Sequence, residues 1–265
     1  PLIDGFGEYE TQMKSIQTIS ANTGLKGEEG IATINAALDE LNEYADQTIY
    51  NFTEMTKNIG TFTAAGVDLD TATGAIQGIA NLGAVSGSTS QQVSTAMYQL
   101  SQALASGTVK LQDWNSVVNA GMGGEVFQEA LKRTARAHGI AVDQMIEENG
   151  SFRESLKDGW LTSEVLTDTL NQLTLSYEEV GDEAYNAGYE MLRNAGYSHE
   201  DAVAILELAK TAQEAATKVR TWSQLWDTVG EALGSGWAQT WRIIIGDFNK
   251  ATELFTFFSE KITGI

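Results

Sequence analysis

The chain has 265 residues, of which 42% are hydrophobic, a formal net charge of −20 and no cysteine. This length and apolar content are sufficient for a buried core and exclude a disordered tail, and the missing cysteine excludes disulfides and thiolate metal sites. The acidity also argues against specific nucleic-acid binding, because phosphate contacts require Lys and Arg.

A single proline, Pro1, stands against 26 glycines. A loop-rich β-sandwich normally carries prolines in its turns, so this balance favours helices joined by glycine-containing corners. We therefore predict an all-α, multi-helix domain. Because the chain begins with Pro1 rather than Met, we expect it to be a processed product or a segment of a longer protein.

The chain divides into three predicted parts. Residues 1–30 are expected to form a helix through Met13, Ile16 and Ile19, followed by a loop with Gly24, Gly27 and Gly30. Residues 31–220 are predicted to form the helical domain. Residues 221–265 are predicted to form an apolar, Trp-rich helical arm.

Apolar residues that recur every three or four positions predict the individual helices. The expected ranges are Glu29–Ala45, Ile49–Ile59, Leu69–Leu82, Leu111–Val118, Glu125–Ala137, Ala141–Glu148, Ser163–Leu175, Asp182–Asn194 and Ser198–Lys210. Ser88 followed by Gln91 predicts a capping box that opens a further helix ending near Gly107. Gly60 and Gly83 are expected at helix ends, and Gly196 is expected to close one helix before Ser198 caps the next.

The stretch Leu100–Phe127, LSQALASGTVKLQDWNSVVNAGMGGEVF, combines small residues with a few large anchors. Small residues allow backbones to approach closely, so this composition favours packing and assembly over chemistry. Trp114 and Met122 are the anchors that we predict to serve partner contacts or self-association. Gly121–Gly124 is expected to be a turn, since it lacks the preceding strand and the following Lys-Ser/Thr of a phosphate loop.

The C-terminal arm is the most apolar part of the chain. Two interpretations are open: its aromatic residues form a buried helix–helix seam, or they form an apolar face that a second copy, a tube wall or a membrane interface covers. Apolar density favours a partner. The candidate self-association residues here are Trp222, Trp226, Trp237, Trp241, Phe255 and Phe258. No run reaches the roughly 18 apolar residues that a membrane-spanning helix needs.

The chemistry-bearing residues do not form a recognisable catalytic pattern. His138 and His199 lie far apart in the sequence, and neither has the partners of a catalytic triad or a zinc site. We predict no enzymatic activity, no cofactor and no metal. The basic cluster Lys132, Arg133 and Arg136 is expected to pair with nearby acidic residues, with a partner or phosphate contact as the alternative.

Several motifs together resemble the tape-measure domain of tail tape measure proteins from long-tailed bacteriophages. These motifs are LNEYADQTIYNFT (41–53), MTKNIG (55–60), AMYQLSQA (96–103), LQDWNS (111–116), AGMGG (120–124), SGWAQTWR (235–242) and GDF (246–248). They span most of the chain. The resemblance is strongest to the versions carried by phages and phage-tail-like particles of Gram-positive bacteria.

The resemblance implies a virion structural protein that sets tail length, nucleates tube assembly, occupies the tube lumen or tail tip and leaves during genome ejection. It also implies assembly in the host cytoplasm. The expected partners are further copies of the chain in a trimer, the tail tube protein, distal tail and tail-tip or baseplate proteins, and the host membrane or envelope on ejection. Two alternatives are a membrane-active helical protein, which the apolar arm favours, and a peptidoglycan hydrolase, which some tape measure proteins carry as an appended domain.

Overall fold

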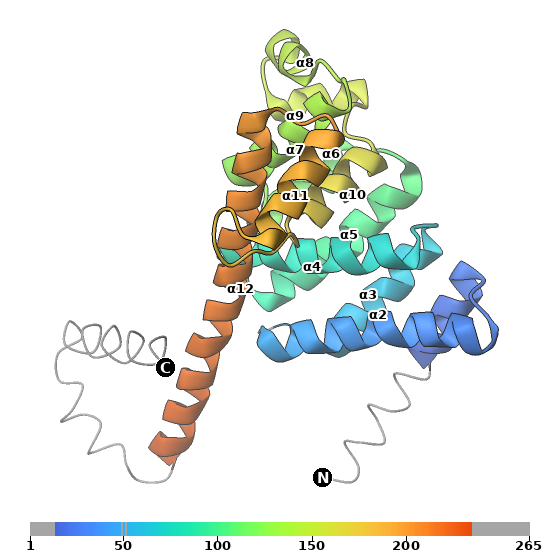
Figure 1. Cartoon of the computed structure of the whole chain (residues 1–265), viewed down its shortest axis with the longest axis vertical. Coiled ribbons are helices and arrows are strands. Elements are labelled where there is room, and N and C mark those ends of the chain that lie inside the picture. Colours follow the sequence, from blue (N-terminus) through green and yellow to red (C-terminus); the bar gives the residue numbers. More distant parts are fainter. Residues whose placement is uncertain (1–13, 49, 51, 235–265) are drawn as a thin grey trace, which may run out of the picture. The chain divides into compact units, whose positions relative to one another are not determined.

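The computed structural model describes residues 14–48, 50 and 52–234 (Figure 1). This part of the chain is built from helices and contains no strand, apart from one isolated antiparallel bridge between Thr108 and Thr162. The prediction of an all-α fold is therefore confirmed. The chain forms two units, Pro1–Arg220 and Thr221–Ile265, and the last described helix runs through the boundary between them.

A helix over residues 14–23 precedes the labelled helices of Figure 1. The labelled helices are α2 (Gly27–Gln47), α3 (Phe52–Ala64), α4 (Leu69–Val85), α5 (Ser90–Ser106), α6 (Leu111–Asn119), α7 (Glu125–Ala137), α8 (Val142–Asn149), α9 (Phe152–Ser155), α10 (Ser163–Gln172), α11 (Glu183–Asn194) and α12 (His199–Gly234). The 3₁₀ turn η1 (Leu156–Asp158) follows α9. The predicted range of α7 agrees at both ends, and α12 continues well beyond the predicted end at Lys210. The three-part division of the chain stays a prediction.

Three glycines that were expected to interrupt or end helices lie inside them instead. Gly30 belongs to α2, Gly60 to α3 and Gly83 to α4. At Gly83 the reason is packing, because an added Cβ would lie 2.2 Å from Cγ2 of Val93 in α5. Glycine at this position allows two helices to approach rather than ending one of them.

The capping box of α5 lies one residue after the predicted position. Thr89 Oγ1 accepts a hydrogen bond from the Gln92 backbone N–H, and Gln92 Oε1 accepts one from the Thr89 N–H at 2.8 Å. Ser88 instead donates its hydroxyl to the carbonyl oxygen of Ala120 at 2.7 Å. Ser88 therefore ties the start of α5 to the end of α6, and Thr89 performs the capping.

Helix α4 is the central helix of the first unit and packs against α2, α3, α5 and α10. Most of its residues are buried, as expected for a helix that is apolar on every side. Gly74 and Gly78 face α10: a Cβ on Gly78 would lie 2.0 Å from the carbonyl oxygen of Leu170, and one on Gly74 would lie 2.3 Å from Oδ1 of Asn171. These two glycines set the close contact between α4 and α10.

The first unit contains two separate apolar cores. The main core, which includes Phe62, Leu100, Phe127 and Leu170, is contributed by helices from residues 14–23 through α10. The second core is small and lies between α11 and α12. It consists of Leu192, Tyr197, Ala202, Ile205 and Leu206, with tyrosines 177, 185 and 189 packed against it. These two cores divide the unit into a large helical body and a helical hairpin.

Candidate functional site

The two histidines have different partners in the structure. His138 Nε2 lies 2.8 Å from Oδ2 of Asp168, and His199 Nδ1 lies 2.9 Å from the hydroxyl of Tyr189. Among the described residues, no group of three or more His, Asp or Glu side chains is arranged to hold a metal ion. The candidate functional features considered for the described residues are surfaces and polar contacts between helices.

Trp114 and Met122 lie in the main core, with 2% and 0% of their surfaces exposed. Trp114 of α6 stacks on Phe127 at 5.9 Å between ring centroids and lies 4.8 Å from the ring of Phe152. Phe152 in turn meets Trp160 edge to face at 5.3 Å. In this structure Trp114 joins α6 to α7 and α9, and Met122 is buried; a role of either residue in contacts between copies stays a prediction.

The other candidate self-association residues belong to the C-terminal arm. Trp222 and Trp226 lie on α12, in the part of the helix whose side chains are not described. Trp237, Trp241, Phe255 and Phe258 lie outside the described residues. Contacts of the arm with a partner therefore also stay a prediction.

Apolar side chains do reach the surface on α6. Leu111 is 38% exposed and Val118 is 47% exposed. A spacing of seven residues places both on one side of the helix, and Trp114, three residues after Leu111 and four before Val118, lies on this same side but is buried. The large residues of the Leu100–Phe127 stretch thus divide between the core and the surface, and helical spacing alone does not separate Trp114 from Leu111 and Val118.

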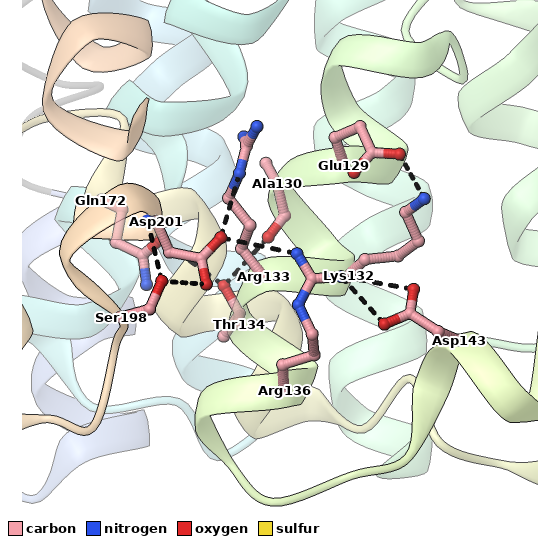
Figure 2. A network of polar contacts seen from close by, with 10 residues as sticks. All are labelled: Glu129, Ala130, Lys132, Arg133, Thr134, Arg136, Asp143, Gln172, Ser198 and Asp201. Carbon is pink, nitrogen blue, oxygen red and sulfur yellow. Dashed lines mark hydrogen bonds and ion pairs between the residues drawn. The ribbon is translucent and has the colours of Figure 1, made fainter. Parts of the chain in front are cut away.

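The basic cluster of α7 pairs with acidic residues, as predicted (Figure 2). Lys132 pairs with Glu129 one turn earlier, and Arg136 contacts a carboxylate oxygen of Asp143 in α8 at 3.1 Å. The third acid was not foreseen: Asp201 of α12 lies 3.5 Å from Arg133 Nε and 3.5 Å from an Arg136 nitrogen. Asp201 lies far from Arg133 and Arg136 in the sequence, so no local pattern indicated this contact.

Asp201 contacts Ser198 at the start of its own helix in addition to the two arginines of α7. Its carboxylate accepts a hydrogen bond from the Ser198 hydroxyl at 2.8 Å, and its own backbone N–H donates to the Ser198 oxygen at 3.0 Å. Burial by itself lowers the pKa of Arg136, but the hydrogen bonds and negative charges of Asp143 and Asp201 outweigh it and raise that pKa. The guanidinium therefore stays charged in this contact.

A row of uncharged polar groups accompanies these ion pairs. The buried Tyr197 accepts a hydrogen bond at its hydroxyl from the Gln172 amide at the end of α10. Gln172 Oε1 lies 3.5 Å from Oγ1 of Thr134, which lies 2.8 Å from Oγ1 of Thr169. Together with Asp201, these groups connect α7 and α10 of the helical body to the hairpin.

A polar surface cleft of about 250 Å³ lies between α2, α4 and α12, lined by residues that include Glu40, Glu43, Gln77 and Gln213. Tyr44 closes its inner side by donating to Oδ1 of Asn81 at 2.7 Å. Burial raises the pKa of the Tyr44 phenol well above its ordinary value, and neighbouring Tyr50 raises it further. The cleft is smaller than the usual ligand pocket of roughly 300–1,000 Å³, and sequence reasoning did not find it.

No described helix combines the length and the apolarity that crossing a membrane requires. Comparison with protein families identifies a model described as tape measure protein, which matches residues 2–188 and thus well over half of the chain. Comparisons with curated proteins and with solved structures gave no match. The matched family is structural rather than enzymatic and has its role in phage tails. The chain therefore belongs to the tape measure protein family.

Proposed function

We propose that this chain is a helical segment of a phage tail tape measure protein that acts in tail assembly and length determination. It lies in the tail tube or tail tip of a phage or phage-tail-like particle of a Gram-positive host and is released during genome ejection. The observation that carries this proposal is the family match over residues 2–188. The continuous main core supports it, since a packed helical body is suited to a structural role.

The proposed partners are two further copies of the chain, the tail tube protein and the distal tail, tail-tip or baseplate proteins. The exposed apolar side chains Leu111 and Val118 of α6 offer a contact area for one of them. The net charge of −20 disfavours binding to DNA, which occupies the same tube. A segment with this charge separates readily from a genome that follows it.

The assembly role is tested by damaging the core of this segment in the full-length protein in its phage. Leu100→Asp places a charge at a side chain that is 1% exposed, whereas Gln102→Asp changes an exposed residue of the same helix. We expect L100D to give few tails or tails of irregular length in electron micrographs, and Q102D to give normal tails. Normal tails in both variants would overturn the proposal.

The proposed location is tested by protease treatment of intact and ejected particles. A segment inside the tube is shielded by the tube wall, so antibodies against it should detect the full-size band after treatment of intact particles. Triggered ejection should then make the same segment degradable. Rapid degradation in intact particles, with the tube protein still intact, would place the chain outside the tube and contradict the proposal.

Contact with the host membrane on ejection is a second proposed role, which the apolar composition of residues 221–265 favours. The purified chain is expected to release dye from lipid vesicles, and replacement of Trp237 and Trp241 by Ala is expected to reduce the release. Replacement of the core residue Trp114 serves as the control for loss of folding. Absence of leakage with the unmodified chain would remove this role and leave the assembly role untouched.

A further inference from the structure

The helical hairpin, defined here as residues 177–217, carries its own stabilising contacts. Asp182 accepts hydrogen bonds from the backbone N–H groups of Tyr185, Glu178 and Glu179 at 2.6, 2.8 and 2.9 Å, which fixes the start of α11. Lys210 of α12 donates to the Glu178 carbonyl oxygen and lies 4.8 Å above the ring of Tyr177. With the second core between α11 and α12, these contacts hold the hairpin together without the helical body.

The apolar contact between the hairpin and the body is thin. The buried residues of α12 that follow the second core are Ala209, Ala212 and Ala216. Gln213 lies on the same helical face and donates to the Leu175 carbonyl oxygen at 2.6 Å, which places this face against the connection after α10. Alanine buries much less apolar surface than leucine, so this face contributes little hydrophobic stabilisation.

Larger apolar side chains cross the boundary at few positions. Leu208 is half-buried against the main core, and Ala137 and Leu175 pack against the second core. Polar links across the boundary include the ion pairs of Asp201 with Arg133 and Arg136, and the hydrogen bond between Tyr197 and Gln172. Ion pairs with partly exposed side chains are weak and are screened by salt.

We propose that the hairpin detaches from the helical body as one unit while both keep their cores, and that Asp201 is the latch that holds it closed. Opening breaks the contacts of Asp201 with Arg133 and Arg136 and exposes these two arginines of α7. The second core moves with the hairpin. The proposal depends only on contacts within this chain and is independent of the proposed role in the tail.

Hydrogen exchange of the purified chain, followed by mass spectrometry, tests this latch. Asp201→Asn removes the charge but keeps an oxygen acceptor for Ser198. We expect a roughly five- to tenfold increase in exchange of the α11 and α12 amides, with the amides of α4 and α5 unchanged. Raising the salt concentration from low to about 0.5 M should have the same effect on the unmodified chain.

Two further variants separate the latch from other effects of the substitution. Asp143→Asn removes the other carboxylate on Arg136, but it lies in α8, so exchange in the hairpin should not change. The double variant Arg133→Gln, Arg136→Gln removes both partners of Asp201 on α7 and leaves the start of α12 unchanged. It should therefore raise hydrogen exchange of the hairpin amides as much as D201N does. If D201N raises hydrogen exchange in the hairpin but the double arginine variant does not, the effect of D201N comes from the start of α12, and the proposal is wrong.

A distance measurement provides a second readout. The chain has no cysteine, so fluorescent labels can be attached to Asn194→Cys in α11 and Ala105→Cys in α5, both at exposed positions. We expect a second population with a longer distance, which grows with salt and in D201N. A single distance under all conditions, with hairpin amides exchanging only at the rate of the main core, would overturn the proposal.

Discussion

Two glycines of α4 show how single residues determine the packing of this chain. Gly74 and Gly78 are both helical and both face α10, where even a methyl group would overlap with Asn171 or with the Leu170 backbone. Helical glycine is entropically unfavourable relative to alanine, so its presence here reflects the close approach of two helices. Gly60 of α3, by contrast, has room for a methyl group, so substitution of Gly60 and of Gly78 is expected to have opposite effects.

Gly78→Ala is expected to lower the free energy of unfolding by about 2–3 kcal/mol, because backbone atoms of α10 must move. Gly60→Ala in α3 is the matched control: its new methyl group would meet Thr18 Cγ2 at 3.4 Å, an ordinary contact. There we expect stabilisation of about 0.5–1 kcal/mol from the higher helix propensity of alanine. Urea unfolding measures both, and equal effects in the two variants would refute this explanation.

The buried Tyr44 phenol makes stability sensitive to alkaline pH. Because its folded-state pKa lies above the ordinary value of 10, its contribution is complete below about pH 10 and is lost as the pH rises toward the folded pKa. Tyr44→Phe removes the hydrogen bond to Asn81, and we expect it to lower stability by about 1 kcal/mol at pH 8.

The same variant should lose less stability between pH 8 and pH 11 than the unmodified chain, since one buried ionisable phenol is gone. Urea unfolding at the two pH values provides the comparison. Tyr98→Phe, at an exposed phenol, serves as the control. A pH dependence unchanged by Y44F would show that Tyr44 ionises in the folded state as it does in water.

At the scale of the element, helix caps account for several of the boundaries. Asp68 caps α4 by accepting a hydrogen bond from the Thr71 N–H at 2.9 Å. Burial alone raises the pKa of Asp68, but its hydrogen bonds with Thr71 outweigh burial and leave the pKa below its ordinary value. Since α4 is the central helix, this cap affects the whole helical body.

Asp68→Ala is expected to lower stability by about 1 kcal/mol at neutral pH. A depressed folded-state pKa gives a contribution that is present above the ordinary pKa of 3.8 and is lost as the pH falls through the folded value, so the difference should shrink in acid. Thermal unfolding of D68A and of Asp70→Ala, an exposed acid in the same turn, checks this. Equal losses at neutral pH would assign the effect to charge near the helix start instead of to the cap.

The buried and the exposed apolar residues of α6 are expected to differ in function. Trp114→Ala removes a buried ring that contacts Phe127 and Phe152, so it should lower the free energy of unfolding by about 3–5 kcal/mol. Val118→Ser changes a side chain that is 47% exposed and should alter stability by less than about 0.5 kcal/mol.

Chemical denaturation and sedimentation of both variants distinguish folding from association. If the exposed face of α6 serves contacts between copies, V118S should weaken the association of the folded chain without changing its stability. A stable W114A variant would contradict the placement of this tryptophan in the core.

At the scale of the whole molecule, the sequence predicted the helices better than how they pack against one another. The apolar periodicity of Glu125–Ala137 and the terminating glycine at 107 are local signals, and both agree with the structure. Gly83 was misassigned because a helix-ending glycine and a close-packing glycine look alike until Val93 is placed against it.

The candidate site was less predictable than the fold for the same reason. Pairing of Lys132 and Arg136 with acids could be expected from a crowded, acidic chain, but the contact of Arg133 with Asp201 depends on how α12 folds back onto α7. The burial of Trp114 depends on Phe152, which lies on a helix of only four residues. Contacts over such sequence separations have no local signature.

Tail length is the measurement that tests the central claim most directly. Adding 36 helix-forming residues after Thr217 in α12, ten full turns that keep the helix faces in register, lengthens that helix by about 54 Å. If the full-length protein acts as a ruler through this segment, tails of phages carrying the insertion should be longer by about that amount in electron micrographs. Viable particles with tails of unchanged length would contradict the account.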